Sequence, residues 1–375
     1  AMFALLSAMG SRTPVFLNRG FNLPDIDLLA DAFGRLLLNF TWWVNRKDAE
    51  GRNLFQGGFL GLDNIGPIDR SHLPEGYVIE QADGTSWMAF YALMMLRMAI
   101  RLAPHDDAYA PMALKFLEHF ATITDGMATV GLFDAEDGFF YDQLVRPDGS
   151  REPIRVRSLV GVIPVLAGAF IDQGSRFASS PRYQQRLADF LRRRGADQAA
   201  NENDHSTGFL QMRHDETGNK ALLTVVDPDR LRRVLLEVLS EDSMLSPHGL
   251  RSVSKRLEGA PYQINLDGQE YGIDYEPAES TTPIYGGNSN WRGPVWFPIN
   301  HLVIEALERY YLYLGDDFTV ECPTGSGVMM NLQEVAAEIR RHTPKLSTAV
   351  MSDRYNTIEQ QQAFFEILIS ALRAG

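Results

Sequence analysis

Four segments that lie far apart in the chain combine glycine, aromatic rings, carboxylates and amides in the same way. The most distinctive, ESTTPIYGGNSNWRGPVW at 279–296, places two of the five tryptophans beside an arginine, in a stretch with enough glycine to interrupt regular structure. A core segment would be richer in Val, Ile and Leu, and an ordinary surface loop rarely uses tryptophan. This composition therefore indicates a surface that binds a ligand. The other three segments are NLFQGGFLGLDNIGPIDRS (53–71), EQADGTSW (80–87) and DGFFYD (137–142).

These residue types together suit a sugar. A pyranose presents an apolar face of C–H groups that stacks on an aromatic ring, and its hydroxyls need the planar donors and acceptors of Asn, Asp and Arg. A lone tryptophan in a helical protein is more often a core residue, but Trp291 and Trp296 flank Arg292 at an expected helix start, which favours a ligand platform. Since the segments share one chemistry, their side chains are expected to converge on one cavity. These side chains are Asp63, Trp87, Asp142, Arg292 and Trp296.

Carboxylates are the best-supplied catalytic groups of this chain. The sequence holds no P-loop, dinucleotide-binding glycine fingerprint, HExxH motif or nucleophile elbow. Its single cysteine, Cys322, excludes an internal disulfide and a thiolate metal cage. Hydrolysis of a glycoside needs only a carboxylic acid and a carboxylate, so we expect such chemistry without a metal or a cofactor. From composition alone, Asp63 in GLDN is equally consistent with a functional group and with a turn cap.

Helices must position these segments, because helical periodicity dominates the rest of the chain, with apolar residues at i, i+3, i+4 and i+7. Possible N-caps are Asp25 for the first helix, Asp83 or Thr85 for the second, and Asp227 for the helix that begins at Pro228. The expected helices are 24–44, 85–103, 107–124, 158–170 with a weaker pattern, 181–194, 228–239, 294–313, 331–341 and 357–373.

Strand signals are few and short. The segment 138–146 is followed by the turn PDGS, and 261–275 contains an Asp-Gly hairpin turn at Asp267–Gly268. No Gly/Ser linker or charge run divides the chain. The sequence therefore predicts a single all-α domain over 1–375 with short β-hairpins in its loops. Helix pairs around a central axis would give a toroid, and a two-layer helical bundle is the alternative.

The composition of the chain indicates which classes of partner and which cellular location to expect. The chain is 45% hydrophobic and 22% charged, as in a soluble globular protein, and its net charge of −13 disfavours nucleic acid. Apolar runs such as 87–100 are interrupted or too short to span a bilayer, so we expect no membrane association. The opening AMFALLSAM lacks the basic region of a signal peptide. We therefore expect a cytoplasmic protein whose partner is a carbohydrate, with the oligomeric state left open.

Several of the quoted stretches together resemble a known enzyme family. GLDNIGPIDRS, EQADGTSWMAFYALMML, DYEPAESTT and GGNSNWRGPVWFPINHLVIEAL are similar to the catalytic domain of glycoside hydrolase family 63 and its bacterial mannosylglycerate-hydrolase-like relatives, which are related to trehalases and glucoamylases. The resemblance covers roughly residues 36 to 335. It implies an (α/α)6 barrel, which is a toroid of six helical hairpins, with an inverting active site at one end.

The resemblance also implies roles for particular residues. Asp63, the aspartate of GLDN, corresponds to the general acid. The family's substrates are α-glucosides and related glycosides, often with terminal glucose or mannose. The residues implied to contact the sugar are Asn64, Asp83, Trp87, Asp142, Asn290, Trp291, Arg292 and Trp296.

The tail departs from the family pattern. The family places its second carboxylate near its C-terminus in an aromatic-Glu-aromatic stretch, followed by a Gly-rich loop and a closing Gly-Trp helix. Here the FFEIL stretch around Glu366 reads as part of one amphipathic helix, with Glu366 beside the apolar stripe and facing solvent. The resemblance therefore implies that the chain is altered or truncated there. The general base stays open between Glu366 and Glu279, which lies in a site loop.

The sequence thus predicts an inverting glycoside hydrolase that acts on α-linked glucosides or mannosides, of oligosaccharide or glycosyl-glycerate type. One alternative is a weak or inactive carbohydrate-binding remnant that lacks the base. Another is a structural helical toroid used for protein contacts. Sugar binding separates the last possibility from the first two, and glycoside hydrolysis separates those two from each other.

Overall fold

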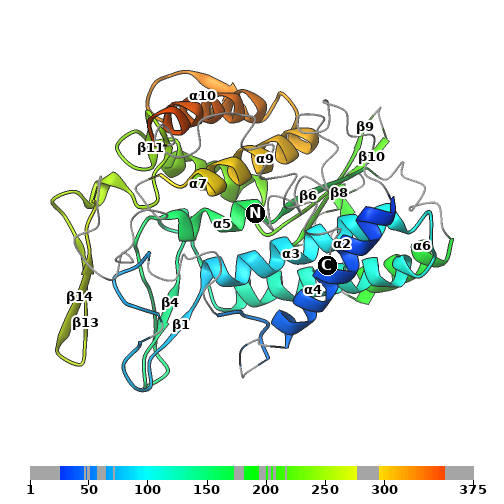
Figure 1. The fold of residues 1–375 in the computed structure, drawn as a ribbon, viewed down its shortest axis with the longest axis horizontal. Coiled ribbons are helices and arrows are strands. Elements are labelled where there is room, and N and C mark those ends of the chain that lie inside the picture. The colour runs from blue at the N-terminus through cyan, green and yellow to red at the C-terminus, as the bar shows by residue number, and fades with distance from the viewer. Residues whose placement is uncertain are drawn as a thin grey trace.

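The computed structural model describes residues 26–45, 48, 51–56, 65–70, 72–172, 181–193, 200–201, 204–205, 208–215, 218–276 and 295–350. Over these residues the protein is a mixed structure of helices and small antiparallel sheets (Figure 1). The prediction of an all-α chain is therefore wrong, because part of the chain forms a five-stranded sheet. A closed toroid is not confirmed.

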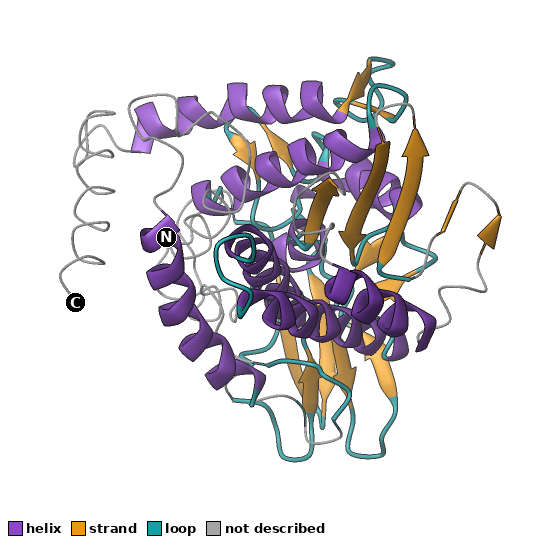
Figure 2. Ribbon diagram, turned by 90° about the vertical axis from the view of Figure 1, so that its right-hand side faces the viewer, coloured by secondary structure: helices purple, strands orange, loops and turns teal. Residues whose placement is uncertain are grey.

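Helix α3 (Ala82–Leu102) lies at the centre of the described structure. Eighteen of its 21 residues are buried, as expected for a helix that is largely apolar on every face and enclosed by other elements. Helix α4 (Tyr109–Thr129) packs along it after a short connection, and α2 (Ile26–Val44) covers another side (Figures 1 and 2). The Tyr91 hydroxyl of α3 donates a 2.8 Å hydrogen bond to the Leu36 carbonyl of α2. Three of the expected helices thus pack together around α3.

A second group of helices lies above α3 in Figure 1, on a different side of α3 from α2 (Figure 2). It contains α9 (Phe297–Leu314), α10 (Leu332–Val350), the short α5 (Ile163–Leu166) and α7 (Pro228–Val238) (Figure 1). The predicted cap of α7 is confirmed, because the Asp227 side chain accepts a 2.8 Å hydrogen bond from the Arg230 N–H.

The five-stranded antiparallel sheet is the main element that the sequence does not predict. It lies at the end of the molecule opposite the paired strands β1 and β4 and the β13–β14 hairpin, with α6 (Pro181–Arg193) nearby (Figure 1). Its strands, in spatial order, are β6 (Gly168–Asp172), β10 (Gly218–Thr224), β9 (Leu210–Asp215), β8 (Asp204–His205) and β7 (Ala200–Asn201).

The weak helix predicted over 158–170 is one source of this error. The structure divides that segment into a 3₁₀ turn (Leu159–Gly161), α5 and the start of β6. Gly161 lies so close to other groups that a Cβ there would stand 2.2 Å from the Phe139 ring, and Gly168 packs on the Tyr310 ring. A short apolar run broken by glycine is consistent with strand or helix, and periodicity alone does not separate them.

The small hairpins agree better with the sequence. The PDGS turn joins β4 to β5, with the Arg146 N–H donating to the Ser150 carbonyl at 2.9 Å. Asp267 and Gly268 have φ angles of 53° and 87°, as an Asp-Gly hairpin turn requires. The paired strands are β1 (Val78–Glu80), β4 (Gln143–Val145) and β5 (Arg151–Pro153); β2 (Phe133–Asp134) and β3 (Phe139–Phe140); β11 (Leu245–Ser246) and β12 (Gly249–Leu250); β13 (Tyr262–Leu266) and β14 (Gln269–Ile273); β15 (Thr319–Glu321) and β16 (Met329–Asn331).

Some helix limits differ from the predicted ones. The second helix begins at Ala82, and neither Asp83 nor Thr85 is its N-cap residue, since Gln81 holds that place. The helices predicted to end at 124 and 341 continue to Thr129 and Val350. No helix among the described residues is both long enough and apolar enough to cross a membrane. The predicted cap Asp25 and the helix 357–373 lie outside the described residues.

Candidate functional site

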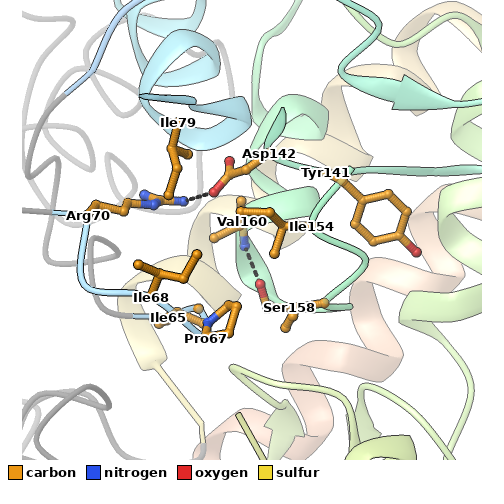
Figure 3. Close-up of a pocket in the computed structure, with 12 residues that line it drawn as sticks. Ile65, Pro67, Ile68, Arg70, Ile79, Tyr141, Asp142, Ile154, Ser158 and Val160 are labelled. Carbon is orange, nitrogen blue, oxygen red and sulfur yellow. Dashed lines mark hydrogen bonds and ion pairs between the residues drawn. The ribbon is translucent and has the colours of Figure 1, made fainter. Parts of the chain in front are cut away.

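Three charged side chains from separate segments, Arg70, Asp83 and Asp142, meet at the N-terminus of α3. Figure 3 shows the contact between Arg70 and Asp142. Strand β1 ends at Glu80 and runs almost directly into α3, while β4 begins immediately after Asp142. Because Glu80 pairs with Gln143 in the antiparallel β1–β4 ladder, Asp142 comes to lie against the first residue of α3. Its Oδ1 accepts a 2.8 Å hydrogen bond from the Ala82 N–H. Asp142 therefore satisfies one of the free N–H groups of the helix end.

Arg70 joins the two aspartates of this cluster. Its Nη1 lies 3.0 Å from each carboxylate oxygen of Asp83, and its Nη2 donates to Oδ2 of Asp142. The side chains of Arg70, Asp83 and Asp142 are only 5%, 2% and 9% exposed. We refer to these three residues as the Arg70 cluster.

The electrostatics of the Arg70 cluster leave an excess of negative charge when both carboxylates are ionised. The positive end of the α3 macrodipole stabilises such a charge. Burial raises the pKa of Asp142 above its ordinary value, and Asp83 raises it further, against the lowering effect of Arg70 and of the Ala82 N–H. Burial alone would lower the pKa of Arg70, but the carboxylates of Asp142 and Asp83 raise it. The cluster thus holds a permanent cation beside a carboxyl that binds a proton more readily than usual.

A small pocket opens beside the Arg70 cluster. Its free space is about 10 Å³, roughly the room for one water molecule, so in this structure it does not hold a sugar ring. The polar groups at its wall come from Arg70, Asp142 and Ser158, and most of the remaining wall is apolar (Figure 3). One side of the wall is the segment 65–70, which follows Asp63 and Asn64 directly in the chain.

A short extended segment connects this pocket to the start of α9. Ser158 of the pocket wall forms an antiparallel bridge with Val253, and Arg251, two residues earlier, forms another with Val295. Residues 251–254 therefore lie between the pocket wall and the residue that precedes Trp296. Two strand spacings correspond to roughly 10 Å. The β-bridges thus bring two segments of similar composition, far apart in sequence, into one neighbourhood.

The predicted site residues divide into four groups. Asp83 and Asp142 are brought together, and both are held by Arg70. Trp296 is half-buried immediately before α9. Trp87 is completely buried and packs against Phe90 with ring centroids 6.0 Å apart, so its ring is a core surface in this structure and offers no face for stacking. Asp63, Asn64, Glu279, Asn290, Trp291, Arg292 and Glu366 lie outside the described residues.

Arg70 is the member of the cluster that sequence reasoning missed. Arg70 lies near the end of the stretch GLDNIGPIDRS. It was not predicted to be a site residue, because a single arginine in a loop is usually solvated. Its position in the sequence could have indicated a role, because Arg70 precedes the stretch EQADGTSW, which contains Asp83. A buried arginine needs an anionic partner, and two of the nearby predicted site residues were aspartates.

Comparison with known proteins gives one clear sequence relative and distant structural likenesses. No family model matches the chain. The chain is 43% identical over 336 residues to the uncharacterized protein YMR196W of Saccharomyces cerevisiae, an alignment that covers 85% of this chain. It spans only 30% of the length of that relative.

Two solved structures from Thermus thermophilus show a distant likeness, each with a TM-score of 0.45 and 14% identity over 92% of this chain. One is an uncharacterized conserved protein, of which 68% is covered. The other is a glycoside hydrolase family 63 mannosylglycerate hydrolase in complex with glucose, of which 66% is covered.

Proposed function

We propose that this chain is an inverting glycoside hydrolase domain, built on an (α/α)6 toroid, that acts on α-linked glucosides or mannosides. The observation that carries the proposal is the Arg70 cluster, buried at the N-terminus of α3 beside a pocket whose wall follows Asp63 in the chain. The sequence motifs around Asp63 and Trp296 indicate that the ligand is a sugar and that the reaction is hydrolysis of a glycoside.

Burial of three charged groups in one place is expensive for a structural contact. An apolar cluster of similar volume is often as stable or more stable than a buried ion pair. Arg70 and Asp142 line the small pocket, and buried charges next to such a space are candidates for binding a ligand. A guanidinium and two carboxylates supply donors and acceptors that match sugar hydroxyls. In this proposal Asp83 and Asp142 bind and orient the sugar.

The reaction itself is assigned to other carboxyl groups. Asp63 protonates the leaving glycosidic oxygen, and a second carboxylate removes a proton from the attacking water on the opposite face of the sugar. Glu279 and Glu366 are the candidates for that second role. Inversion requires a separation of roughly 6.5–9.5 Å between the two carboxyl groups, because a water molecule must fit between the base and the sugar.

Asp63→Asn tests the proposal directly. The amide keeps the shape of the side chain but donates no acidic proton, so hydrolysis of nitrophenyl α-glucosides and α-mannosides should fall by about 10²–10⁴-fold. Sugar affinity, measured by calorimetry, should change little. The matched control is Asp107→Asn, which alters an exposed aspartate near the start of α4 and should leave turnover unchanged.

The outcomes separate the alternatives. Undiminished turnover in Asp63→Asn would remove that residue from the mechanism. A wild-type chain that binds sugar without hydrolysing any glycoside would be the carbohydrate-binding remnant. If the chain binds no sugar, the whole proposal is contradicted. The remaining alternative is then a structural protein that serves protein contacts.

A further inference from the structure

The entry into α9 is held by an unusual set of contacts. Asn300, in the first turn of α9, is completely buried. Its Oδ1 accepts from the Leu250 N–H at 2.6 Å, and its Nδ2 donates to the Leu250 carbonyl at 3.2 Å. The same Nδ2 donates to the Trp296 carbonyl at 2.9 Å. The Asn300 amide therefore pairs with Leu250 as a neighbouring strand would and fixes the residue just before the helix.

This contact depends on a glycine. Gly249 has a φ of +112°, and a Cβ at that position would lie 2.7 Å from the Asn300 Oδ1. Only glycine combines this backbone conformation with so close an approach. The backbone of β12 at Gly249 and the Asn300 side chain of α9 therefore fit closely against each other, with no room for a side chain at position 249.

Arg251 holds the neighbouring part of the same segment. Its guanidinium is buried, and Nη1 donates to the carbonyls of Glu241 and Ser243 at 3.1 Å each, and also to the Leu245 carbonyl. Its Nε donates to the Tyr275 hydroxyl at 3.2 Å, while its backbone forms the bridge to Val295.

Arg251 therefore contacts one residue that precedes a long connecting segment and one residue that follows it. Tyr275 and Val295 lie on either side of the stretch that carries ESTTPIYGGNSNWRGP. The residues that follow Arg251 contact the pocket wall, where Val253 forms a bridge with Ser158 and the Ser252 carbonyl accepts from the Leu159 N–H at 2.9 Å.

We propose that Arg251 and Asn300 are positioning residues that fix Trp296 relative to the pocket beside the Arg70 cluster. The role rests on the proposed function, because it assumes that Trp296 contacts a sugar. Arg251 suits this task because its planar fork donates in several fixed directions, which a lysine does not reproduce. Neither residue touches the sugar in this proposal, and both act through Trp296.

The test uses variants that keep the fold. Tyr275→Phe removes one hydroxyl, and Arg251→Lys keeps the charge but loses the fork. Hydrogen exchange of the peptide 295–300 should become faster in both variants, while exchange in α3 stays unchanged. Arg230→Lys, which alters a more exposed arginine on α7, is the matched control. Unchanged exchange at 295–300 would overturn the positioning role whatever the protein binds.

A double-mutant cycle then separates positioning from general destabilisation. Arg251→Lys should weaken sugar affinity by about 2–10-fold, the range expected for disturbing one aromatic contact. In a Trp296→Ala background the same change should have no further effect on affinity, because the residue through which it acts is gone. Full additivity of the two affinity losses would overturn the proposal, and so would an affinity that Trp296→Ala leaves intact. Absence of sugar binding by the wild-type chain would instead contradict the proposed function.

Discussion

The two ends of α3 hold charged side chains in different ways, since Arg70 is buried and Arg97 is only partly buried. At the N-terminal end, Arg70 is held between Asp83 and Asp142. At the C-terminal end, Arg97 lies near Arg309 and Arg101, and its Nη1 contacts the Met94 sulfur at 4.0 Å. Each excess charge has the sign that the helix macrodipole favours, negative at the N-terminus and positive at the C-terminus.

The two ends of α3 differ in how closely the charged groups are paired and in whether those groups line a pocket. Burial lowers the pKa of Arg97 to about 9, and the charges of Arg309 and Arg101 act in the same direction, against the raising effect of Glu305. The carboxylates raise the pKa of Arg70 instead. The Arg70 cluster also faces a pocket. A buried charge by itself therefore does not mark a site. Close pairing next to open space is the better criterion.

The largest effect should come from Arg70→Met. It leaves two carboxylates buried without their cation, so the free energy of unfolding should fall by about 3–5 kcal/mol. Urea unfolding at neutral pH measures this change, and calorimetry should show that sugar binding is lost as well. A cost below that of Arg97→Met would break the comparison between the two ends.

The deficit of Arg70→Met should depend on pH. Without Arg70, burial and Asp83 still raise the pKa of Asp142, and the main opposing influence is gone. A carboxyl whose folded-state pKa is raised destabilises the fold above that pKa, and the destabilisation disappears below the unfolded-state value of about 3.9. The variant should therefore recover stability relative to wild type as the pH falls toward 4. Unfolding curves between pH 4 and pH 8 test this, and a deficit that is constant over the range would contradict it.

Asp83→Asn should be more destabilising than Asp142→Asn. Asp83 receives two contacts from Arg70, whereas Asp142 receives one and can keep its bond to the Ala82 N–H through an amide oxygen. Hydrogen bonds to charged groups contribute about 1.5–3 kcal/mol, so the first change should lie in that range and the second below it. Parallel urea titrations decide the order, and the reverse order would show that the cluster is centred on Asp142.

The smallest effect should come from Arg97→Met. The methionine fills similar space and removes a charge whose burial is unfavourable, so stability should change by less than about 1 kcal/mol. Thermal and urea unfolding of the variant against wild type provide the measurement. A large loss would mean that the C-terminal end of α3 holds its charges as firmly as the N-terminal end.

The sequence predicted the parts of the fold that local patterns specify. The periodic runs of α2, α3 and α4 and the Asp267–Gly268 turn were recognisable without tertiary information. The five-stranded sheet was not, because strands β7 and β8 have only two residues each and their pairing is set by contacts elsewhere in the fold.

The candidate site shows the same division. Shared composition predicted that four segments would converge on one cavity, and among the described residues the segments carrying Asp83 and Asp142 meet at Arg70. The composition did not identify Arg70, since nothing local shows that a loop arginine will be buried. Trp87 carried the same composition signal but lies on a helix that is enclosed almost completely, so burial decided its environment.

The enclosure of α3 has a consequence for the order of folding. Helices α3 and α4 are neighbours in sequence and can pair early, since local contacts close short loops. The segment that carries Arg70 and the strand that follows Asp142 must then dock on an existing helix end. Contacts absent from the folding transition state act on the rate of unfolding rather than on the rate of folding. Stopped-flow measurements on Asp142→Asn should therefore show faster unfolding and nearly unchanged folding, and a slower folding rate would place the Arg70 cluster in the folding nucleus.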